Sequence, residues 1–167
     1  MATMDKAELA ELAERVLRGE RRALARAISL VEDGDPAARD ILRSAYPHAG
    51  RARVVGVTGA PGVGKSTLVD RLAAIYRKEG LTVAILAVDP TSPFTGGAIL
   101  GDRIRMQDLG TDPGVFIRSL ATRGHMGGLT RNTGQVIALI YAAGIDRVLV
   151  APVAACQGEV EVRSYAQ

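Results

Sequence analysis

The sequence has 167 residues, 47% of them hydrophobic and 23% charged, which is the composition of a soluble globular domain with a core of its own. A formal net charge of +3, 4% aromatic residues and the absence of Trp argue against a nucleic-acid partner. The single cysteine, Cys156, excludes an intrachain disulfide and a cysteine metal cluster within this sequence.

The N-terminal stretch alternates charged residues with Ala and Leu and lacks the apolar centre of a signal peptide. No apolar run reaches the length of a membrane span. We therefore expect a cytoplasmic protein with no membrane partner. His48 and His125 lie far apart without ligand-like neighbours, which favours surface positions over metal binding.

Residues 1–50 predict three helices, because apolar side chains recur there at helical spacing. The apolar positions are Leu9, Leu12, Val16 and Leu17, then Leu24, Ile28 and Val31, then Ile41 and Leu42. Gly19 and Gly34 are suited to end the first two helices, and Asp35-Pro36 to provide the N-cap and first position of the third. We expect this small helical segment to precede a separate domain over residues 51–167. The arginine-rich helix faces fit either an acidic partner or a solvated surface with Glu–Arg pairs, and we favour the second interpretation.

A short apolar run, Val54 to Val57, is typical of a buried strand in a parallel sheet. It leads into Gly59-Ala60-Pro61-Gly62-Val63-Gly64-Lys65-Ser66-Thr67, which fits the phosphate-binding pattern G-x-x-x-x-G-K-[ST]. Glycines allow several backbone N–H groups to converge on phosphate oxygens, and the amino end of the following helix adds further donors. Lys65 can reach the outer phosphates, and the Ser66 hydroxyl is placed to bind Mg²⁺. The stretch therefore predicts a nucleotide site rather than a simple glycine-rich turn.

The segment after this loop predicts a helix and a second strand. The expected inner face of the helix consists of Leu68, Leu72, Ile75 and Tyr76. Gly80 is suited to end this helix, and the apolar run from Thr82 to Val88 predicts a strand that ends at Asp89. Strand, helix and strand in this order predict a right-handed parallel crossover.

A long polar segment with several glycines runs from Asp89 to Met106, and loops of this length inside a compact domain are usually functional. Asp89 follows a strand on the side where parallel sheets bind ligands, whereas Asp102 fits either the site or the N-cap of a following helix. A surface connection without a function is the alternative interpretation of this segment.

The remaining sequence continues the alternation of strands and helices. Val115 to Arg118 predicts a third strand, which leads into another glycine-bearing loop. Arg118 and Arg123 fit either a phosphate-facing position or an ordinary surface position. Thr133 to Ala143 predicts a helix, and Arg147 to Val150 predicts a fourth strand. The pattern predicts a doubly wound α/β domain.

Three stretches of the sequence carry a family resemblance: VTGAPGVGKST, VDPTSPFTGGAILGDRIRM and FIRSLATRGHMGGL. With the helical preface, they resemble the methylmalonyl-CoA-mutase-associated GTPases of the MeaB (ArgK) family, from about Leu9 to Val150. Members of this family are chaperones of an adenosylcobalamin-dependent enzyme. The resemblance implies an α/β P-loop NTPase fold with a mostly parallel sheet, GTP and Mg²⁺ as ligands, and an adenosylcobalamin-dependent methylmalonyl-CoA mutase as partner. It is also compatible with a homodimer.

The resemblance also implies roles for individual residues. Gly59–Thr67 would wrap the phosphates, with Lys65 on the β- and γ-phosphates and Ser66 as a Mg²⁺ ligand. Asp89 and Asp102 match acidic positions that serve the metal and the switch regions in relatives. They are therefore expected to bind the metal with Ser66, and to be catalytic residues with Lys65. Such a site positions phosphate and water and balances charge rather than forming covalent intermediates.

One departure from the family pattern follows the fourth strand. The family carries a Glu-Thr-Val-Gly-like segment there, and this sequence reads Ala151-Pro152-Val153-Ala154. The carboxylate that helps to hold Mg²⁺ or its water is therefore missing at Ala151, and Ala154 replaces a glycine that approaches the γ-phosphate. Gln157 and Glu159 still fit the pattern, but nothing in the sequence places Glu159 near the metal.

A second departure concerns length. The family continues with an Asn-Lys-x-Asp element that reads guanine and with further strands, none of which this sequence contains. Guanine preference therefore rests on the resemblance, and the sheet is expected to be incomplete, with open edges. We expect a GTPase with impaired hydrolysis. The alternatives are a nucleotide-binding fragment that does not hydrolyse, or another P-loop ATPase or kinase.

Overall fold

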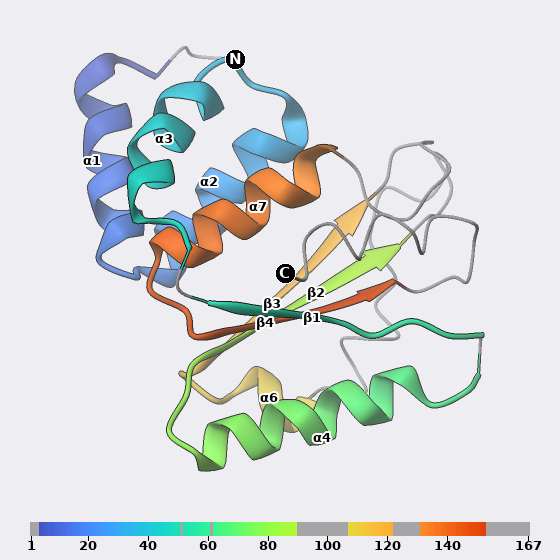
Figure 1. Cartoon of the computed structure of the whole chain (residues 1–167). Coiled ribbons are helices and arrows are strands. Elements are labelled where there is room, and N and C mark those ends of the chain that lie inside the picture. The colour runs from blue at the N-terminus through green and yellow to red at the C-terminus, as the bar shows by residue number, and fades with distance from the viewer. Residues whose placement is uncertain (1–3, 51, 61, 90–106, 122–130, 153–167) are drawn as a thin grey trace. The chain divides into compact units, whose positions relative to one another are not determined.

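The computed structural model describes five stretches of the chain: residues 4–50, 52–60, 62–89, 107–121 and 131–152. Their contacts divide the chain into two compact units (Figure 1). The first comprises Met1–Ala52 and Arg131–Ile145, and the second comprises Arg53–Thr130 and Asp146–Gln167. The domain boundary expected after residue 50 stays a prediction. The first unit also includes Arg131–Ile145, a segment much later in the sequence that contacts the N-terminal helices.

The first unit is helical. Its elements are α1 (Lys6–Leu17), α2 (Arg21–Asp33), α3 (Ala38–Ala45), the 3-10 helix η1 (Tyr46–His48) and α7 (Arg131–Ala142). The three helices expected from the apolar spacing of the first 50 residues are present, and α7 contacts both α2 and α3. The largest buried side chains of this unit include Val16, Leu24, Ile28, Ile41, Leu139 and Ile140. No helix in the described part of the chain combines the length and apolar character that a membrane crossing requires.

The helix ends of this unit follow ordinary capping chemistry, with one correction. Asp5 and Glu8 form a reciprocal capping box at the start of α1, with the Glu8 N–H 2.7 Å from Asp5 Oδ1. The helix α3 begins at Ala38 with Ala37 as its N-cap, so the expectation that Asp35 is the N-cap is wrong. Asp35 Oδ1 instead accepts a hydrogen bond from the Ala37 N–H at 2.9 Å, which forms a turn that precedes the helix.

The second unit is an α/β unit with a parallel sheet. It contains β1 (Arg53–Gly56), α4 (Lys65–Lys78), β2 (Val83–Asp89), α6 (Gln107–Gly110), β3 (Val115–Ala121) and β4 (Arg147–Pro152). The strand order is β1-β4-β2-β3, and every pair is parallel. The predicted α/β fold with a mostly parallel sheet is therefore confirmed. Each of the four predicted strands is present: β1 lies one residue earlier than expected, and β3 and β4 begin where expected and extend further.

The inner face of α4 differs from the prediction. Val69 and Ala73 are fully buried, with Leu72 and Tyr76 packed beside them, whereas Leu68 is 51% exposed and Ile75 is 50% exposed. The expectation that Leu68 and Ile75 face the sheet is therefore wrong. Small side chains at the centre of the buried stripe allow α4 to lie close to the sheet, which turns the bulkier neighbours outward. The shared core of the helix and sheet consists of Val57, Val69, Ala73, Val83, Ile85, Val115, Leu149 and Ala151.

A polar contact joins the amino ends of β2 and β4. Asp146 Oδ2 accepts hydrogen bonds from the Thr82 N–H at 2.8 Å and from the Thr82 hydroxyl at 2.7 Å. The Asp146 N–H donates back to Thr82 Oγ1 at 3.0 Å. The bonds from Thr82 favour the ionised carboxylate, so that the pKa of Asp146 lies below its ordinary value. This pairing fixes the start of two neighbouring strands.

A second polar contact ties the carboxyl end of α4 to the start of β3. The Arg77 guanidinium donates to both carboxylate oxygens of Asp112, each at 3.0 Å, and to the Leu81 carbonyl at 2.7 Å. The hydrogen bond to Asp112 raises the pKa of Arg77 further. Gly114 lies directly against the guanidinium, where an added Cβ would collide with it. The two contacts hold the edge of the sheet at which the strands begin.

Candidate functional site

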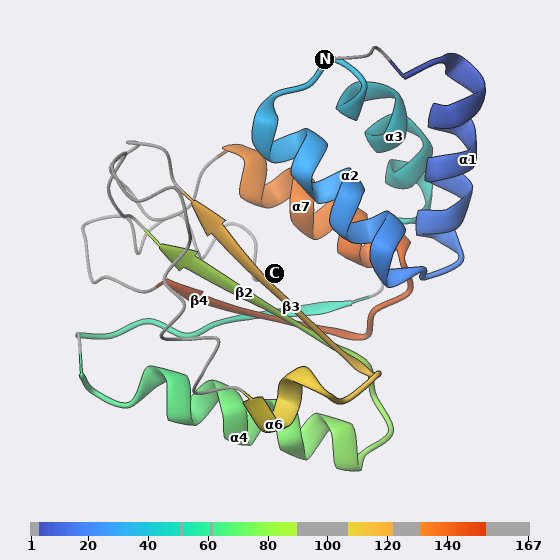
Figure 2. The same cartoon turned by 180° about the vertical axis from the view of Figure 1, so that it is seen from behind.

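The predicted phosphate-binding loop lies at the edge where the strands end. The chain leaves β1 at Gly56, the Val57 N–H donates to the Val150 carbonyl at 2.9 Å, and α4 begins at Lys65. In Figure 2 the arrowheads of β2, β3 and β4 lie toward the same side as the start of α4. Ligands of parallel α/β sheets bind at the carboxyl ends of the strands. The loop is therefore placed where this architecture provides a site.

The loop depends on glycine at Gly59 and Gly64. Their φ angles are +145° and +96°, a region that residues with a Cβ rarely adopt. Gly64 is the N-cap of α4 and makes no side-chain capping bond, and the first turn of α4 carries no acidic residue. The Leu68 N–H donates to the Gly64 carbonyl, so that the helical bonding pattern starts only there. Among the described residues, no hydrogen-bond acceptor is found for the amides of Lys65, Ser66 and Thr67, and the positive end of the helix dipole favours an anion at this end of α4.

The Lys65 side chain folds back over the loop that precedes it. Its ammonium group donates to the Gly59 carbonyl at 2.6 Å and to the Ala60 carbonyl at 2.9 Å. An ammonium has three donors, so these two bonds leave one that no described residue takes up. The arrangement holds a positive charge over the glycine-rich backbone, where phosphate oxygens would meet both the charge and the amides. The motif predicted the lysine but gave no signal for these two carbonyl partners.

Ser66 occupies the first turn of α4 and is partly buried, whereas Thr67 is exposed. Mg²⁺ prefers oxygen ligands and keeps several waters, so that one hydroxyl and the phosphate oxygens of a nucleotide suit it. The described residues contain no group of three or more His, Cys, Asp or Glu side chains that could hold a metal by themselves. The residues present therefore fit a Mg²⁺ that arrives with a nucleotide and is shared between it and Ser66.

The structure describes only some of the acidic and basic residues that the sequence predicted at the nucleotide site. The backbone of Asp89 ends β2, in register with Ala121 of β3, which places this residue at the ligand-binding edge of the sheet. The side chain of Asp89 lies outside the described part of the chain. Arg118 lies within β3, in register with Leu86, three residues before the strand ends. A phosphate-facing role for it stays a prediction.

Several other residues that the sequence singled out lie wholly outside the described residues. They are Pro61, Asp102, Arg123, His125, Ala154, Cys156, Gln157 and Glu159. Their expected roles remain predictions from the motif or from the family resemblance.

Ala151 occupies a buried position beside the loop. It lies in β4, in register with Ala87 of β2, and is 9% exposed. Its methyl group belongs to the same apolar cluster as Val57, which precedes the loop, and Val69, which follows it on α4. A carboxylate at this position would therefore project into the space between the sheet and the start of α4. The family resemblance implies an acid at this position, and such an acid would add a negative charge on the side of the sheet that carries the loop.

Comparisons with known proteins agree with this architecture. The model of the family described as methylmalonyl Co-A mutase-associated GTPase MeaB matches residues 24–167. A relative from Pyrococcus abyssi is 57% identical over 152 residues, which are 91% of this chain and 47% of the relative. GTPase ArgK of Escherichia coli is 42% identical over 163 residues, covering 95% of this chain and 49% of that protein. The chain thus spans about half the length of the curated relatives it matches.

A solved structure is similar as well. The crystal structure of a protein described as LAO/AO transport system kinase matches with a TM-score of 0.76 at 33% identity. The match covers 96% of this chain and 48% of the other. The family model covers most of the chain, including the loop, the sheet and α7, and the relatives confirm the resemblance expected from the three sequence stretches. The chain belongs to the MeaB family of methylmalonyl-CoA mutase-associated P-loop GTPases.

Proposed function

We propose that this chain binds the phosphates of Mg-GTP in the loop Gly59–Thr67, as part of a GTPase that serves a methylmalonyl-CoA mutase. The observation that carries the proposal is the geometry at the start of α4. Gly64 leaves the first amides of the helix uncapped, and the ammonium of Lys65 is held over the same backbone. Open amides, a helix dipole and a lysine together suit the β- and γ-phosphates of a nucleotide.

Each residue of the loop has a separate task in this proposal. Lys65 exchanges its bonds to the Gly59 and Ala60 carbonyls for phosphate oxygens and offsets their negative charge. Ser66 holds Mg²⁺, with Asp89 and Asp102 as the acidic residues that the family resemblance assigns to the metal and to catalysis. When bound, the metal supplies positive charge that stabilises the phosphates during hydrolysis.

Hydrolysis by this chain is proposed to be slow. Ala151 places a methyl group in an apolar cluster where the family carries an acid that helps to hold Mg²⁺ or its water. Phosphoryl transfer depends on positioning and charge balance, so the loss of one such group lowers the rate more than it lowers nucleotide affinity. The observation at Ala151 also favours a second candidate function, in which the chain binds nucleotide without hydrolysing it.

The proposed partner is an adenosylcobalamin-dependent methylmalonyl-CoA mutase in the cytoplasm. Two comparisons support this partner: the family description names the mutase, and a relative is named as the mitochondrial methylmalonic aciduria type A homolog of Caenorhabditis elegans. That relative is 38% identical over 175 residues. Nucleotide state would then regulate cofactor loading and protection of the mutase, as the resemblance implies, and a homodimer is part of the same proposal.

The test is thermal unfolding of the chain with Mg-GTP, Mg-ATP and GDP. A ligand that binds only the folded state stabilises it by about 2.7 kcal/mol at a concentration one hundred times its Kd. We expect Mg-GTP and GDP to raise the Tm, and a smaller rise with Mg-ATP would support guanine selection, which rests on the family resemblance. No rise with any of the three nucleotides would contradict the proposal, and an equal rise with ATP would contradict guanine selection alone.

A further inference from the structure

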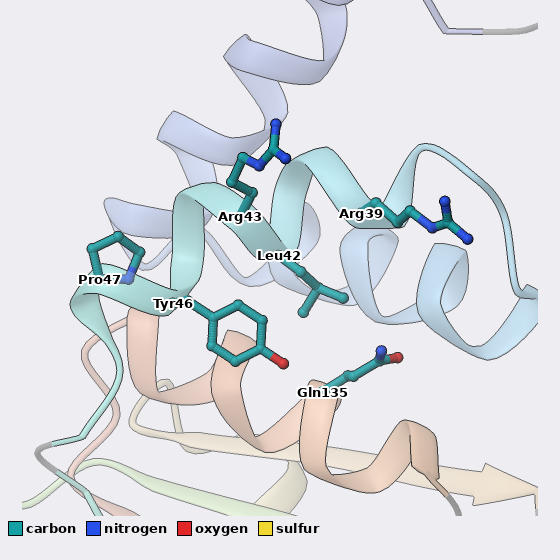
Figure 3. A pocket seen from close by; sticks show the side chains of 6 residues that line it. All are labelled: Arg39, Leu42, Arg43, Tyr46, Pro47 and Gln135. Atoms are coloured by element: carbon teal, nitrogen blue, oxygen red, sulfur yellow. The ribbon is translucent and has the colours of Figure 1, made fainter.

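The first unit contains an open pocket that is unrelated to the phosphate-binding loop. Its volume is about 600 Å³, and α3, η1 and α7 form it (Figure 3). The lining residues are Arg39, Leu42, Arg43, Tyr46, Pro47 and Gln135. The volume lies within the range of pockets that bind ligands. No function proposed above uses any of these residues.

The centre of the pocket is apolar and contains an exposed aromatic ring. Leu42 is buried at its base, and Tyr46 is 57% exposed, which makes it one of four large apolar side chains with an exposed fraction of 50% or more among the described residues. Figure 3 shows the Tyr46 hydroxyl turned toward Gln135 of α7. Tyr offers a large rigid surface with a polar tip, and it is enriched at protein interfaces for that reason.

The rim of the pocket carries two positive charges without carboxylate partners in the described part of the chain. Arg39 and Arg43 are four residues apart on α3 and lie on the same helix face. Elsewhere in the described part of the chain, ion pairs with carboxylates involve Arg15, Arg18 and Arg77, for example Arg15 with Glu20 at 2.8 Å and Arg77 with Asp112 at 3.0 Å. The expectation that Glu–Arg pairs neutralise the arginine-rich faces therefore holds at α1 and not at this rim.

The directions of the two arginines indicate the size of the ligand. In Figure 3 the side chains of Arg39 and Arg43 extend away from one another and beyond the apolar centre. A single small anion is bound best by groups that converge on it, which these two do not. Two separate carboxylates on a longer ligand, with an apolar side chain between them, match an apolar centre flanked by cations.

We propose that this pocket is a docking site for an acidic segment of a partner protein. An aromatic or leucine side chain of the segment inserts between Leu42 and Tyr46, and flanking Glu or Asp residues pair with Arg39 and Arg43. Apolar anchors in a pocket, with Arg and Tyr around them, are the usual centre of protein interfaces. The proposal involves no residue of the nucleotide loop, so its test does not depend on whether the chain binds GTP.

The test uses the full chain and a set of fluorescent synthetic peptides. Each peptide carries one Phe, Trp or Leu with a Glu pair on both sides at varied spacing, and each has a matched peptide with Gln in place of Glu. We expect at least one Glu peptide to bind in fluorescence anisotropy, and its Gln counterpart to bind at least about tenfold more weakly. The double variant Arg39→Glu/Arg43→Glu and the variant Tyr46→Ser should each weaken binding by a similar factor.

The control variant is Arg22→Glu, which changes an exposed arginine on α2 outside the pocket and should leave peptide binding unchanged. Circular dichroism of each variant establishes that the helices are retained. The proposal is overturned if no Glu peptide binds better than its Gln counterpart, or if Arg22→Glu weakens binding as much as the pocket variants do. Competition by inorganic phosphate or citrate at the affinity of the peptide would show a small-anion site instead, and equal competition by duplex DNA would show a nonspecific polyanion surface.

Discussion

The substitution Gly59→Ala examines the backbone geometry on which the phosphate-binding loop depends. At φ +145° a residue with a Cβ is strained, and such strain costs about 1–3 kcal/mol. The added Cβ would also lie 3.2 Å from Cγ1 of Val63. Val63 is exposed, so that its side chain can rotate away at little cost, and the backbone strain is the larger of the two effects.

We therefore expect Gly59→Ala to lower the free energy of unfolding by about 1–3 kcal/mol in urea titrations. If the loop relaxes instead, its backbone amides leave the positions in which they would meet phosphate oxygens, and Mg-GTP affinity falls at least about tenfold. Stability and affinity are measured on the same samples. If the loop keeps its strained backbone, the free energy of unfolding falls, and if the loop relaxes, the Mg-GTP affinity falls.

Two further variants make this experiment specific. Gly110→Ala is the matched control, because Gly110 has an ordinary φ and an added Cβ there would meet open space. Since alanine also suits the helical backbone of α6, this variant should keep or slightly raise the stability and leave Mg-GTP affinity unchanged. The double variant Gly59→Ala/Val63→Ala removes the close contact but keeps the strain, and it should behave like Gly59→Ala. Recovery in the double variant would refute the reasoning, because it would assign the effect to the collision. Equal behaviour of Gly59→Ala and Gly110→Ala would refute it as well.

Three other substitutions have defined outcomes. Gly114→Ala displaces the far end of the Arg77 side chain and disrupts its contact with Asp112, so we expect the urea unfolding midpoint to fall, whereas an unchanged midpoint would mean that the contact is dispensable. Asp146 has a lowered pKa in the folded chain, so its contribution to stability is present above the unfolded pKa and is lost as the pH falls below about 4. Asp146→Asn should therefore lower stability by about 1–2 kcal/mol at pH 7 and flatten the acid limb of the stability profile, and an unchanged limb would contradict this. Ala151→Glu should raise the rate of GTP hydrolysis above that of the wild type, and a wild-type rate equal to that of full-length relatives would show that the missing acid is not limiting.

The fold was largely predictable because its signals are local. Apolar runs of strand length, a glycine-rich loop between a strand and a helix, and helical spacing over the first 50 residues each depend on a few neighbouring residues. The face of α4 was not predictable in this way. Val69 and Ala73 are smaller than Leu68 and Ile75. A prediction based on the largest apolar residues therefore placed the buried face of α4 about one residue away from its observed position.

Contacts between distant segments gave no local signal. The pairing of Thr82 with Asp146 and that of Arg77 with Asp112 join residues 64 and 35 positions apart, and each is an ordinary polar residue in its own segment. The same holds for Gln135, which α7 brings to the pocket formed by α3 and η1. At the nucleotide site, the motif indicated the position of Lys65. Its bonds to backbone carbonyls could not be predicted, because every residue has such a carbonyl whatever its side chain.

The most direct measurement is the affinity of Mg-GTP for the wild type, Lys65→Ala and Lys78→Ala by isothermal titration calorimetry. Lys78 is exposed in the last turn of the same helix and controls for the loss of one positive charge. We predict that the wild type and Lys78→Ala bind with similar affinity, and that Lys65→Ala binds at least about tenfold more weakly. Equal affinity of Lys65→Ala and Lys78→Ala would contradict phosphate binding by the loop Gly59–Thr67.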